Sequence, residues 1–316
     1  MSNAFIFPGQ GSQEVGMGQA LADAFPAARA VFDEVDDALG EKLSDLMRDG
    51  PQDELTLTQN AQPALMAHSM AVVRVLESDF GISVRDHAAY VAGHSLGEYS
   101  ALAAAGTFSV FDTARLLRTR GLAMQSAVPV GEGAMAALLG VGLDAAQKVA
   151  DAVAEADEVC QIANDNEPTQ VVLSGSKSAV DRIQNVGKEF GVRRAVPLPV
   201  SAPFHCKLMQ PAADMMAKAF AEVTFNAPSV PVVANVTASP LTDPDEIRDN
   251  LVRQVTGTVR WRECVLTMTS AGVDQFYELG TGKILSGLAR RIERTVKADA
   301  VSTPDDVRAA AETLQG

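Results

Sequence analysis

One serine stands in a pattern that suits nucleophilic chemistry. Residues 93–97 read Gly-His-Ser-Leu-Gly, which is a G-x-S-x-G sequence. A serine in this pattern sits on a strained turn between a strand and a helix, with its hydroxyl above the carboxyl edge of a sheet. The amides at the start of the following helix stabilise developing negative charge. The pattern predicts that Ser95 is the nucleophile of an acyl-transfer enzyme; a serine that merely caps a helix has the same local sequence.

A nucleophilic serine needs a base within hydrogen-bond reach, and the chain has four histidines. His68 falls within an amphipathic helical pattern and His87 among polar residues, so we expect a packed side chain and a solvated one. His94 adjoins Ser95, and neighbouring side chains on a turn usually point apart, so it is expected to shape the turn. His205 follows a proline-stiffened segment, and such fixed loops carry catalytic residues. His205 is therefore the favoured general base.

Composition and charge exclude several classes of function. The histidines and the three cysteines show no metal-ligand spacing, so no metal site is expected, and the scattered, odd-numbered cysteines favour a reduced cytoplasm. The net charge of −14 argues against nucleic acid as a partner. The sequence contains no run of 18 apolar residues, so no membrane-spanning segment is expected. The first seven residues lack the basic start and the long apolar run of a signal peptide. Gly9–Gly11 follows an apolar run, but Glu14 stands where a dinucleotide fingerprint needs its third glycine.

The elements that must hold these residues alternate along the chain. The apolar runs at 4–7 and 89–92 predict buried strands that end in glycine-rich loops. We expect one helix to begin near Gln62-Pro63, where proline suits a first turn, and another at the capping sequence of Ser109. Beyond residue 200, predicted helices at 206–220, 244–254, 260–271 and 282–292 alternate with strands near 231–234 and 273–278. This alternation predicts a mostly parallel sheet.

A different order of elements lies between residues 133 and 199. Strand-like runs at 134–139, 159–163, 170–173 and 193–198 are interrupted by helical patterns at 144–155 and 177–190. The order β-α-β-β-α-β is the split βαβ arrangement of a ferredoxin-like unit. We therefore predict a small domain at residues 129–199, inserted in a larger α/β domain made of residues 1–128 and 200–316.

Five motifs together resemble one known family. They are residues 7–13 (Phe-Pro-Gly-Gln-Gly-Ser-Gln), 93–98 (Gly-His-Ser-Leu-Gly-Glu), 120–121 (Arg-Gly), 199–205 (Pro-Val-Ser-Ala-Pro-Phe-His) and 278–283 (Glu-Leu-Gly-Thr-Gly-Lys). Over essentially its full length, the chain resembles the malonyl-CoA:acyl carrier protein transacylases of bacterial type II fatty acid synthesis. The resemblance implies an α/β-hydrolase-like large domain with a ferredoxin-like insertion. It also implies that malonyl-CoA and acyl carrier protein are the substrates and that no cofactor is used. We expect a cytoplasmic protein and a monomer, although the sequence itself does not give the oligomeric state.

The resemblance also assigns roles to individual residues. Ser95 and His205 would form the catalytic dyad, and the backbone carbonyl of Gln254 would orient the histidine in place of an aspartate. The backbone amides of Gln10 and Leu96 would form the oxyanion hole. The implied reaction is ping-pong, through a malonyl-serine ester that the phosphopantetheine thiol of the carrier protein then attacks.

Two further residues would contact the malonyl group. In the family the carboxylate-binding arginine precedes a glycine, which selects Arg120 over Arg118; from its own surroundings Arg120 would be taken for a solvated or ion-paired helix residue. Phe204 stands before the histidine, where many members carry a small residue. An aromatic there resembles the malonyl-selective pattern of polyketide synthase acyltransferase domains, because the ring would crowd a branched α-carbon.

The carrier protein is expected to dock on a local basic patch, since carrier proteins are acidic and so is this chain. The candidate residues, each otherwise an ordinary solvated charge, are Lys188, Arg193, Arg194, Lys207, Arg290, Arg291 and Arg294.

Two alternative functions share parts of this pattern. An acyl-CoA thioesterase or other serine hydrolase has the same turn but passes the acyl group to water; Arg120 and the absence of an evident third, acidic triad member argue against it. A non-catalytic carrier-protein-binding module would not need an intact Ser95 and His205. A stand-alone chain favours fatty acid synthesis, while a polyketide pathway would use the same chemistry.

Overall fold

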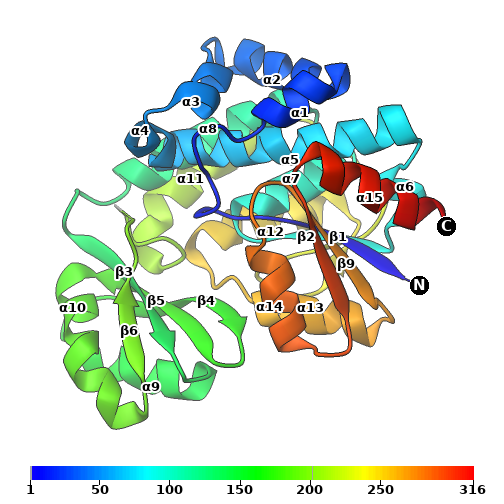
Figure 1. The fold of residues 1–316 in the computed structure, drawn as a ribbon. Helices are drawn as coiled ribbons and strands as arrows, with labels where there is room; N and C mark the ends of the chain where they lie inside the picture. Colours follow the sequence, from blue (N-terminus) through cyan, green and yellow to red (C-terminus); the bar gives the residue numbers. More distant parts are fainter. Residues whose placement is uncertain (1, 201) are drawn as a thin grey trace.

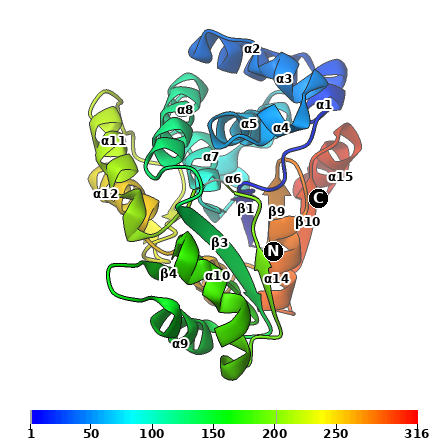
Figure 2. The same ribbon diagram turned by 90° about the vertical axis from the view of Figure 1, so that its left-hand side faces the viewer.

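A computed structural model describes residues 2–200 and 202–316 of the protein. Two sheets organise it, each with its own helices (Figure 1). The smaller sheet, formed by β3 to β6, lies at the lower left of that view, and the two chain ends lie on the opposite side. Figure 2 shows the long helices α5 and α8 above both sheets.

The larger sheet has six strands in the order β10-β9-β1-β2-β7-β8. All neighbours from β10 to β7 run parallel, and β8 alone is antiparallel to its neighbour. The sheet is therefore largely parallel, as the alternation of strands and helices predicted. The strands are β1 (Asn3–Phe7), β2 (Tyr90–Gly93), β7 (Val232–Val233), β8 (Pro240–Leu241), β9 (Gln275–Leu279) and β10 (Lys297–Val301).

Helices cover both faces of this sheet because its central strands are apolar on both sides. In β1, Phe5 and Phe7 join one hydrophobic cluster, whereas Ala4 and Ile6 join another. This alternation follows from the two-residue period of a strand. The helices of the Phe5 side include α2 (Pro26–Leu39), α5 (Thr58–Phe80), α7 (Leu96–Ala104), α8 (Val110–Ser126), α11 (Gln210–Phe220) and α12 (Pro244–Thr256). Those of the Ile6 side are α13 (Trp261–Ser270) and α14 (Ile284–Ile292).

The smaller sheet has the strand order β4-β5-β3-β6, and all its neighbours are antiparallel. A separate hydrophobic cluster, made only of residues between 134 and 195, joins one face of this sheet to its two helices. The elements are β3 (Gly133–Leu139), α9 (Leu143–Val153), β4 (Cys160–Glu167), β5 (Gln170–Ser176), α10 (Lys177–Val186), η1 (Gly187–Phe190) and β6 (Arg194–Pro197).

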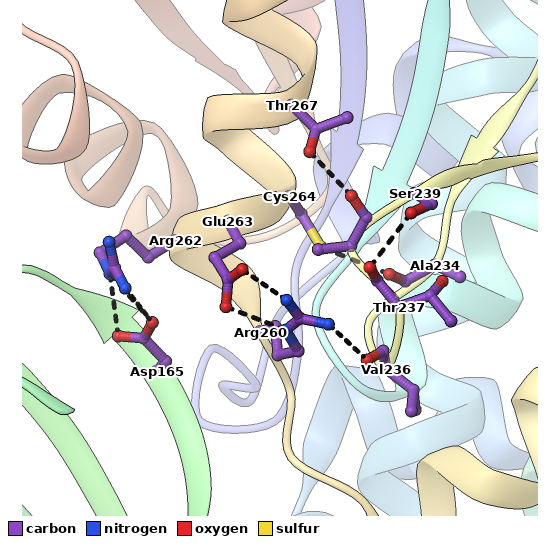
Figure 3. Close-up of polar contacts among 11 residues, drawn as sticks. Asp165, Ala234, Val236, Thr237, Ser239, Arg260, Arg262, Glu263, Cys264 and Thr267 are labelled. Carbon is purple, nitrogen blue, oxygen red and sulfur yellow. Dashed lines mark hydrogen bonds and ion pairs between the residues drawn. The ribbon is translucent and has the colours of Figure 1, made fainter. Parts of the chain in front are cut away.

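Strand β4 joins the two parts of the structure. Val259, which precedes α13, forms a short parallel bridge with β4: its amide donates to the carbonyl of Ala163 (2.8 Å), and its carbonyl accepts from the amide of Asp165 (2.9 Å). Arg262 of α13 then reaches the side chain of Asp165, with its Nε 2.9 Å from Oδ2 (Figure 3). Backbone pairing and a buried carboxylate therefore fix β4 against the larger part of the molecule.

One helix begins earlier than predicted. Helix α5 starts at Thr58, so Pro63 lies inside it rather than in its first turn. The extra turn is held by packing: a Cβ on Gly121 of α8 would lie 2.5 Å from Cα of Gln59 and 2.8 Å from the carbonyl oxygen of Thr58. Tertiary contact thus sets this boundary, and the local preference of proline does not.

The last strand and helix were not predicted. β10 lies at the sheet edge, where Lys297 and Asp299 are exposed and Ala298 and Val301 are buried. Helix α15 (Pro304–Gln315) begins with a full capping box. The predicted helix from residue 206 starts as a 3-10 turn, η2 (Lys207–Met209), before α11. The remaining short helices are α1 (Gln19–Ala24), α3 (Leu43–Asp49), α4 (Gln52–Thr56) and α6 (Val84–His87). No helix among the described residues is long and apolar enough to cross a membrane.

Candidate active site

Ser95 occupies a sharp turn between β2 and α7. Its φ of 54° and ψ of −109° lie outside the regions that most residues adopt. Close backbone packing requires the flanking glycines: a Cβ on Gly93 would lie 1.9 Å from the carbonyl oxygen of Gly97, and one on Gly97 would lie 2.2 Å from that of Phe7. The turn holds the serine hydroxyl at the carboxyl ends of β1 and β2, where open parallel sheets bind ligands.

His205 lies within hydrogen-bond distance of the serine. Its Nε2 is 2.8 Å from Ser95 Oγ, and its Nδ1 is 2.9 Å from the backbone carbonyl oxygen of Gln254. Burial, together with the positive charge of Arg120, lowers the pKa of His205 to about 3. The imidazole is therefore neutral near pH 7. When Nδ1–H donates to the carbonyl, the lone pair on Nε2 is free to accept the serine proton.

Arg120 is buried beside the serine, with 1% of its surface exposed. Its Nη1 donates to Oε1 of Gln62 (2.8 Å), and its Nη2 donates to Oε1 of Gln254 (3.0 Å) and to Ser95 Oγ (3.1 Å). All three acceptors are neutral oxygens. Burial lowers the pKa of Arg120, but a guanidinium stays charged in proteins. Among residues 2–200 and 202–316 it forms no ion pair, so this buried cation can still bind a carboxylate.

Arg118 and Arg120 differ in what they contact. Arg118 forms an ion pair with Glu41 and a hydrogen bond with Asn60, away from the serine. The glycine after Arg120 explains the difference in part. Because Gly121 has no side chain, α8 approaches the start of α5 closely, and the neighbouring Arg120 reaches Gln62 on that helix.

The backbone amides of Gln10 and Leu96 are the two donors of the predicted oxyanion hole. Both residues line the same pocket as Ser95, and within the described chain neither amide donates to an acceptor. The neighbouring amides of Ser95 and Gly97 are already used, by Asn235 and within the turn respectively. Leu96 is the first residue of α7, so the helix dipole adds to its donor.

The pocket above the serine has a volume of about 210 Å³. Arg120 and Gln62 are among its polar lining residues, and Phe204 lies in its wall with 8% of its surface exposed. The wall combines residues from both sheets or the segments next to them, including Met124, Met135, Asn164, Leu198 and Val200. Ser201, part of the predicted histidine motif, lies outside the described residues.

Sequence reasoning missed a second layer of side chains. Asn235 Oδ1 accepts from the amide of Ser95 (2.8 Å), and its Nδ2 donates to the carbonyl of Gly93 (2.7 Å). The side chain of Gln254 donates to the Ser95 carbonyl (3.0 Å) and to the buried carboxylate of Glu98 (2.8 Å). Glu98 alone carried a signal, as the last residue of the second motif.

The loop that carries Asn235 is held by α13. Three side chains, two from this helix and one from the residue just before it, donate to backbone carbonyls of the loop (Figure 3). Arg260 reaches Val236 (3.2 Å), Cys264 reaches Ala234 (3.5 Å) and Thr267 reaches Ala238 (2.7 Å).

The other histidines lie elsewhere or face away from the hydroxyl. His68 is buried in α5, where burial lowers its pKa to about 4 and Nε2 contacts the carbonyl of Ser302. His87 contacts the carbonyl of Ser83. His94 lines the pocket, but its Nε2 lies 2.9 Å from Asn166 Oδ1 and its ring packs beside Trp261.

Comparison with known proteins gives one consistent family. Residues 4–307 match the acyl transferase domain family. The malonyl CoA-acyl carrier protein transacylase of Escherichia coli (strain K12) is 47% identical over 309 residues, 98% of each chain. A crystal structure of an acyl-carrier-protein-S-malonyltransferase from Bartonella henselae has a TM-score of 0.97, 56% identity and full coverage of both chains. A malonyl-transacylase in complex with its type II PKS acyl-carrier protein has a TM-score of 0.95 and 42% identity, covering 99% and 100%.

Proposed function

The chain belongs to the acyl transferase family, among the malonyl CoA-acyl carrier protein transacylases, and we propose that it performs their reaction through an ester on Ser95. It is an acyltransferase that moves a malonyl group from malonyl-CoA to acyl carrier protein. One observation carries the serine assignment: Ser95 Oγ lies 2.8 Å from the neutral base His205 and 3.1 Å from the buried cation Arg120.

The proposed reaction has two symmetrical halves. His205 Nε2 takes the proton of Ser95 as Oγ attacks the thioester carbonyl, and the Gln254 carbonyl stabilises the imidazolium through Nδ1–H. The amides of Gln10 and Leu96 stabilise the oxyanion, a contribution of about 3 kcal/mol per donor. His205 then returns the proton to the departing coenzyme A thiolate, which leaves malonyl-serine. The carrier-protein thiol attacks this ester, and the same steps run in reverse.

We assign the choice of malonyl to Arg120 and Phe204. A guanidinium can offer two parallel hydrogen bonds to the malonyl carboxylate, and the burial of Arg120 strengthens the attraction. Phe204 in the pocket wall would crowd a substituent on the α-carbon. The reaction needs no cofactor, since every proton and charge in it is handled by these residues.

We also propose a division of the chain into two domains. Residues 129–199 would form a ferredoxin-like domain, supported by the order β3-α9-β4-β5-α10-β6, the antiparallel strand order and the separate hydrophobic cluster. Residues 1–128 and 200–316 would form a discontinuous, α/β-hydrolase-like catalytic domain, supported by the parallel sheet and the strained serine turn. Three free, buried cysteines support a reducing cytoplasm, where we expect the protein to act as a monomer.

Intact-mass measurement tests the serine ester. The protein is mixed with malonyl-CoA, and phosphopantetheinylated acyl carrier protein is then added. We expect a malonyl adduct that Ser95→Ala abolishes and that moves to the carrier protein. An adduct that decays to free malonate without transfer would indicate the thioesterase. If the protein never forms an adduct, the covalent route through Ser95 is contradicted. If no malonyl group appears on the carrier protein, the proposed function is contradicted.

A further inference from the structure

The catalytic groups are joined below the pocket by one buried carboxyl group. Glu98, in the first turn of α7, exposes 2% of its surface. Its Oε2 accepts from the backbone amide of Asn235 (3.0 Å) and from Nε2 of Gln254 (2.8 Å). Neither contact is local in sequence, since the residues lie 137 and 156 positions apart. A single oxygen thus connects α7 with the loop after β7 and with α12.

The two groups that Glu98 holds in turn hold the reacting residues. Asn235 accepts from the amide of Ser95 and donates to the carbonyl of Gly93. Gln254 orients His205 with its backbone carbonyl and accepts from Arg120 with its side chain. Displacing either amide would therefore disturb the serine turn, the base or the cation.

Glu98 is also the acid whose charge acts on Arg120 in this buried region. The other ionisable groups that face it are Tyr99 on its own helix and Cys264 on α13, and burial raises the pKa of both, so both are neutral near pH 7. Asn235 and Gln254, from the other two packed segments, are uncharged. A malonyl carboxylate on Arg120 would bring a second negative charge near Glu98.

We propose that Glu98 is a positioning residue of the transfer reaction: its carboxyl oxygen holds Asn235 and Gln254 in place, and its ionised form opposes the carboxylate of an incoming malonyl group. This inference rests on the proposed roles of Ser95, His205 and Arg120. It adds a second determinant of selectivity, which acts from below the pocket without touching the substrate.

The sign of the pH effect follows from the burial of this carboxyl group. Desolvation raises the pKa of Glu98 to about 7, against the smaller opposing effects of its hydrogen bonds and of Arg120. The group is therefore neutral below about pH 6 and anionic above about pH 8. The anion disfavours malonyl binding, so KM for malonyl-CoA should rise with pH. Acetyl-CoA contains the same coenzyme A but has no free carboxylate, so its binding should not change with the ionisation of Glu98.

Two variants of Glu98 separate its charge from its hydrogen bonds. Glu98→Gln keeps an acceptor oxygen and removes the charge, whereas Glu98→Ala removes both. Asp36→Asn is the matched control: Asp36 is likewise buried and accepts from the amide and hydroxyl of Ser44, on the distant α2. For each protein we would measure kcat and KM for malonyl-CoA, and the inhibition constant of acetyl-CoA, at about pH 6 and about pH 8.

For the natural protein and Asp36→Asn we expect KM for malonyl-CoA to rise about tenfold between the two pH values, with a constant inhibition constant for acetyl-CoA. Glu98→Gln should keep kcat and show a low KM at both pH values. Glu98→Ala should lower kcat about tenfold to a hundredfold, because two buried donors lose their acceptor.

A Glu98→Gln protein that keeps the natural rise in KM would overturn the charge effect, even if Glu98→Ala does not fold. A Glu98→Ala protein with natural kcat would overturn the positioning role. Either result is distinguishable from failure of the proposed function, which would appear as loss of the malonyl adduct or of transfer in the natural protein itself.

Discussion

At the scale of residues, the site is a set of buried polar groups with complementary charges. His205 is kept neutral, Arg120 is kept charged, and their immediate partners are uncharged oxygens. Because both side chains are buried, the neutral state of His205 and the positive charge of Arg120 strongly affect their neighbours, since charge interactions are strong where water is excluded. The chemistry follows from which groups are ionised as much as from where they lie.

The first prediction concerns the base. Its depressed pKa means that protonation of His205 removes activity only as the pH falls towards about 3, and not near the usual value of 6.5. We expect kcat/KM for malonyl transfer to show no loss as the pH falls from about 7 to about 5, since this ratio reports the free enzyme. Single-turnover acylation followed by intact mass measures it. A half-loss near pH 6.5 would show that the imidazole is protonated at its usual pKa.

The second prediction concerns the cation. Arg120→Ala should lower the preference for malonyl over acetyl thioesters about a hundredfold, because a charged hydrogen-bonded pair is lost. Competition between malonyl-CoA and acetyl-CoA for the serine gives this ratio. Arg118→Ala is the control, because Arg118 pairs with Glu41 away from the pocket. An unchanged ratio in Arg120→Ala would remove its role in binding the carboxylate.

At the scale of elements, the site depends on how closely strands and helices approach one another. The serine turn needs Gly93 and Gly97 because backbone fills the space of their side chains. Helix α8 brings Arg120 to Gln62 because Gly121 packs on the backbone of α5. These glycines are therefore required by packing between elements rather than by their own torsion angles.

The third prediction tests that packing. Gly121→Ala would place a Cβ 2.5 Å from Cα of Gln59, and backbone atoms cannot easily give way. We expect a loss of about 1–3 kcal/mol in the free energy of unfolding, together with weaker malonyl selectivity as Arg120 moves from Gln62. Gly287→Ala in α14 is the control, because its nearest neighbour is the side chain of Arg291 at 3.4 Å. Helix propensity there favours alanine by up to about 1 kcal/mol.

The third prediction fails if Gly121→Ala and Gly287→Ala unfold at the same denaturant concentration and keep the same selectivity. Chemical denaturation followed by circular dichroism supplies the stability of each variant.

The sequence predicted what is locally encoded. The turn at Ser95 follows from its glycines, and the alternation of strands and helices follows from the apolar runs. The motifs named the residues that were expected to lie near Ser95. The contacts of Glu98, Asn235 and Gln62 were not predictable, because each joins residues far apart in sequence through side chains without a distinctive pattern. Helix α15 was missed although its capping box at Thr303 was visible, and β10 was missed because an edge strand with alternating charges resembles a loop.

At the scale of the whole molecule, we expect an acidic protein to receive an acidic partner. The net charge of −14 opposes the approach of a carrier protein, so docking should depend on local positive charge. All seven candidate basic residues are exposed, but Arg291 is paired with Glu167. In the described chain, Lys188, Arg193, Arg194 and Lys207 form no ion pair, which makes this group the better candidate.

The fourth prediction is a loss of carrier-protein affinity on charge reversal. Arg193→Glu with Arg194→Glu should raise KM for acyl carrier protein about tenfold and leave acylation by malonyl-CoA unchanged, with the difference shrinking at high salt. Lys297→Glu is the control. Lys297 is exposed and is the first residue of the edge strand β10, whereas Ser95 lies at the carboxyl ends of the central strands. Equal KM values for both variants at low salt would refute docking at this group.

The way the pocket is divided between chain segments has a consequence for how such proteins diversify. Its reactive end belongs to the parallel sheet, whereas Met135, Asn164 and Leu198 reach it from the smaller sheet and the segment that follows it. Substitutions in that second group can enlarge or reshape the acyl space while the nucleophile keeps its strained turn. A lineage can thus keep the reaction and the carboxylate-binding arginine, and still change the rest of the acyl space through a separate stretch of the gene.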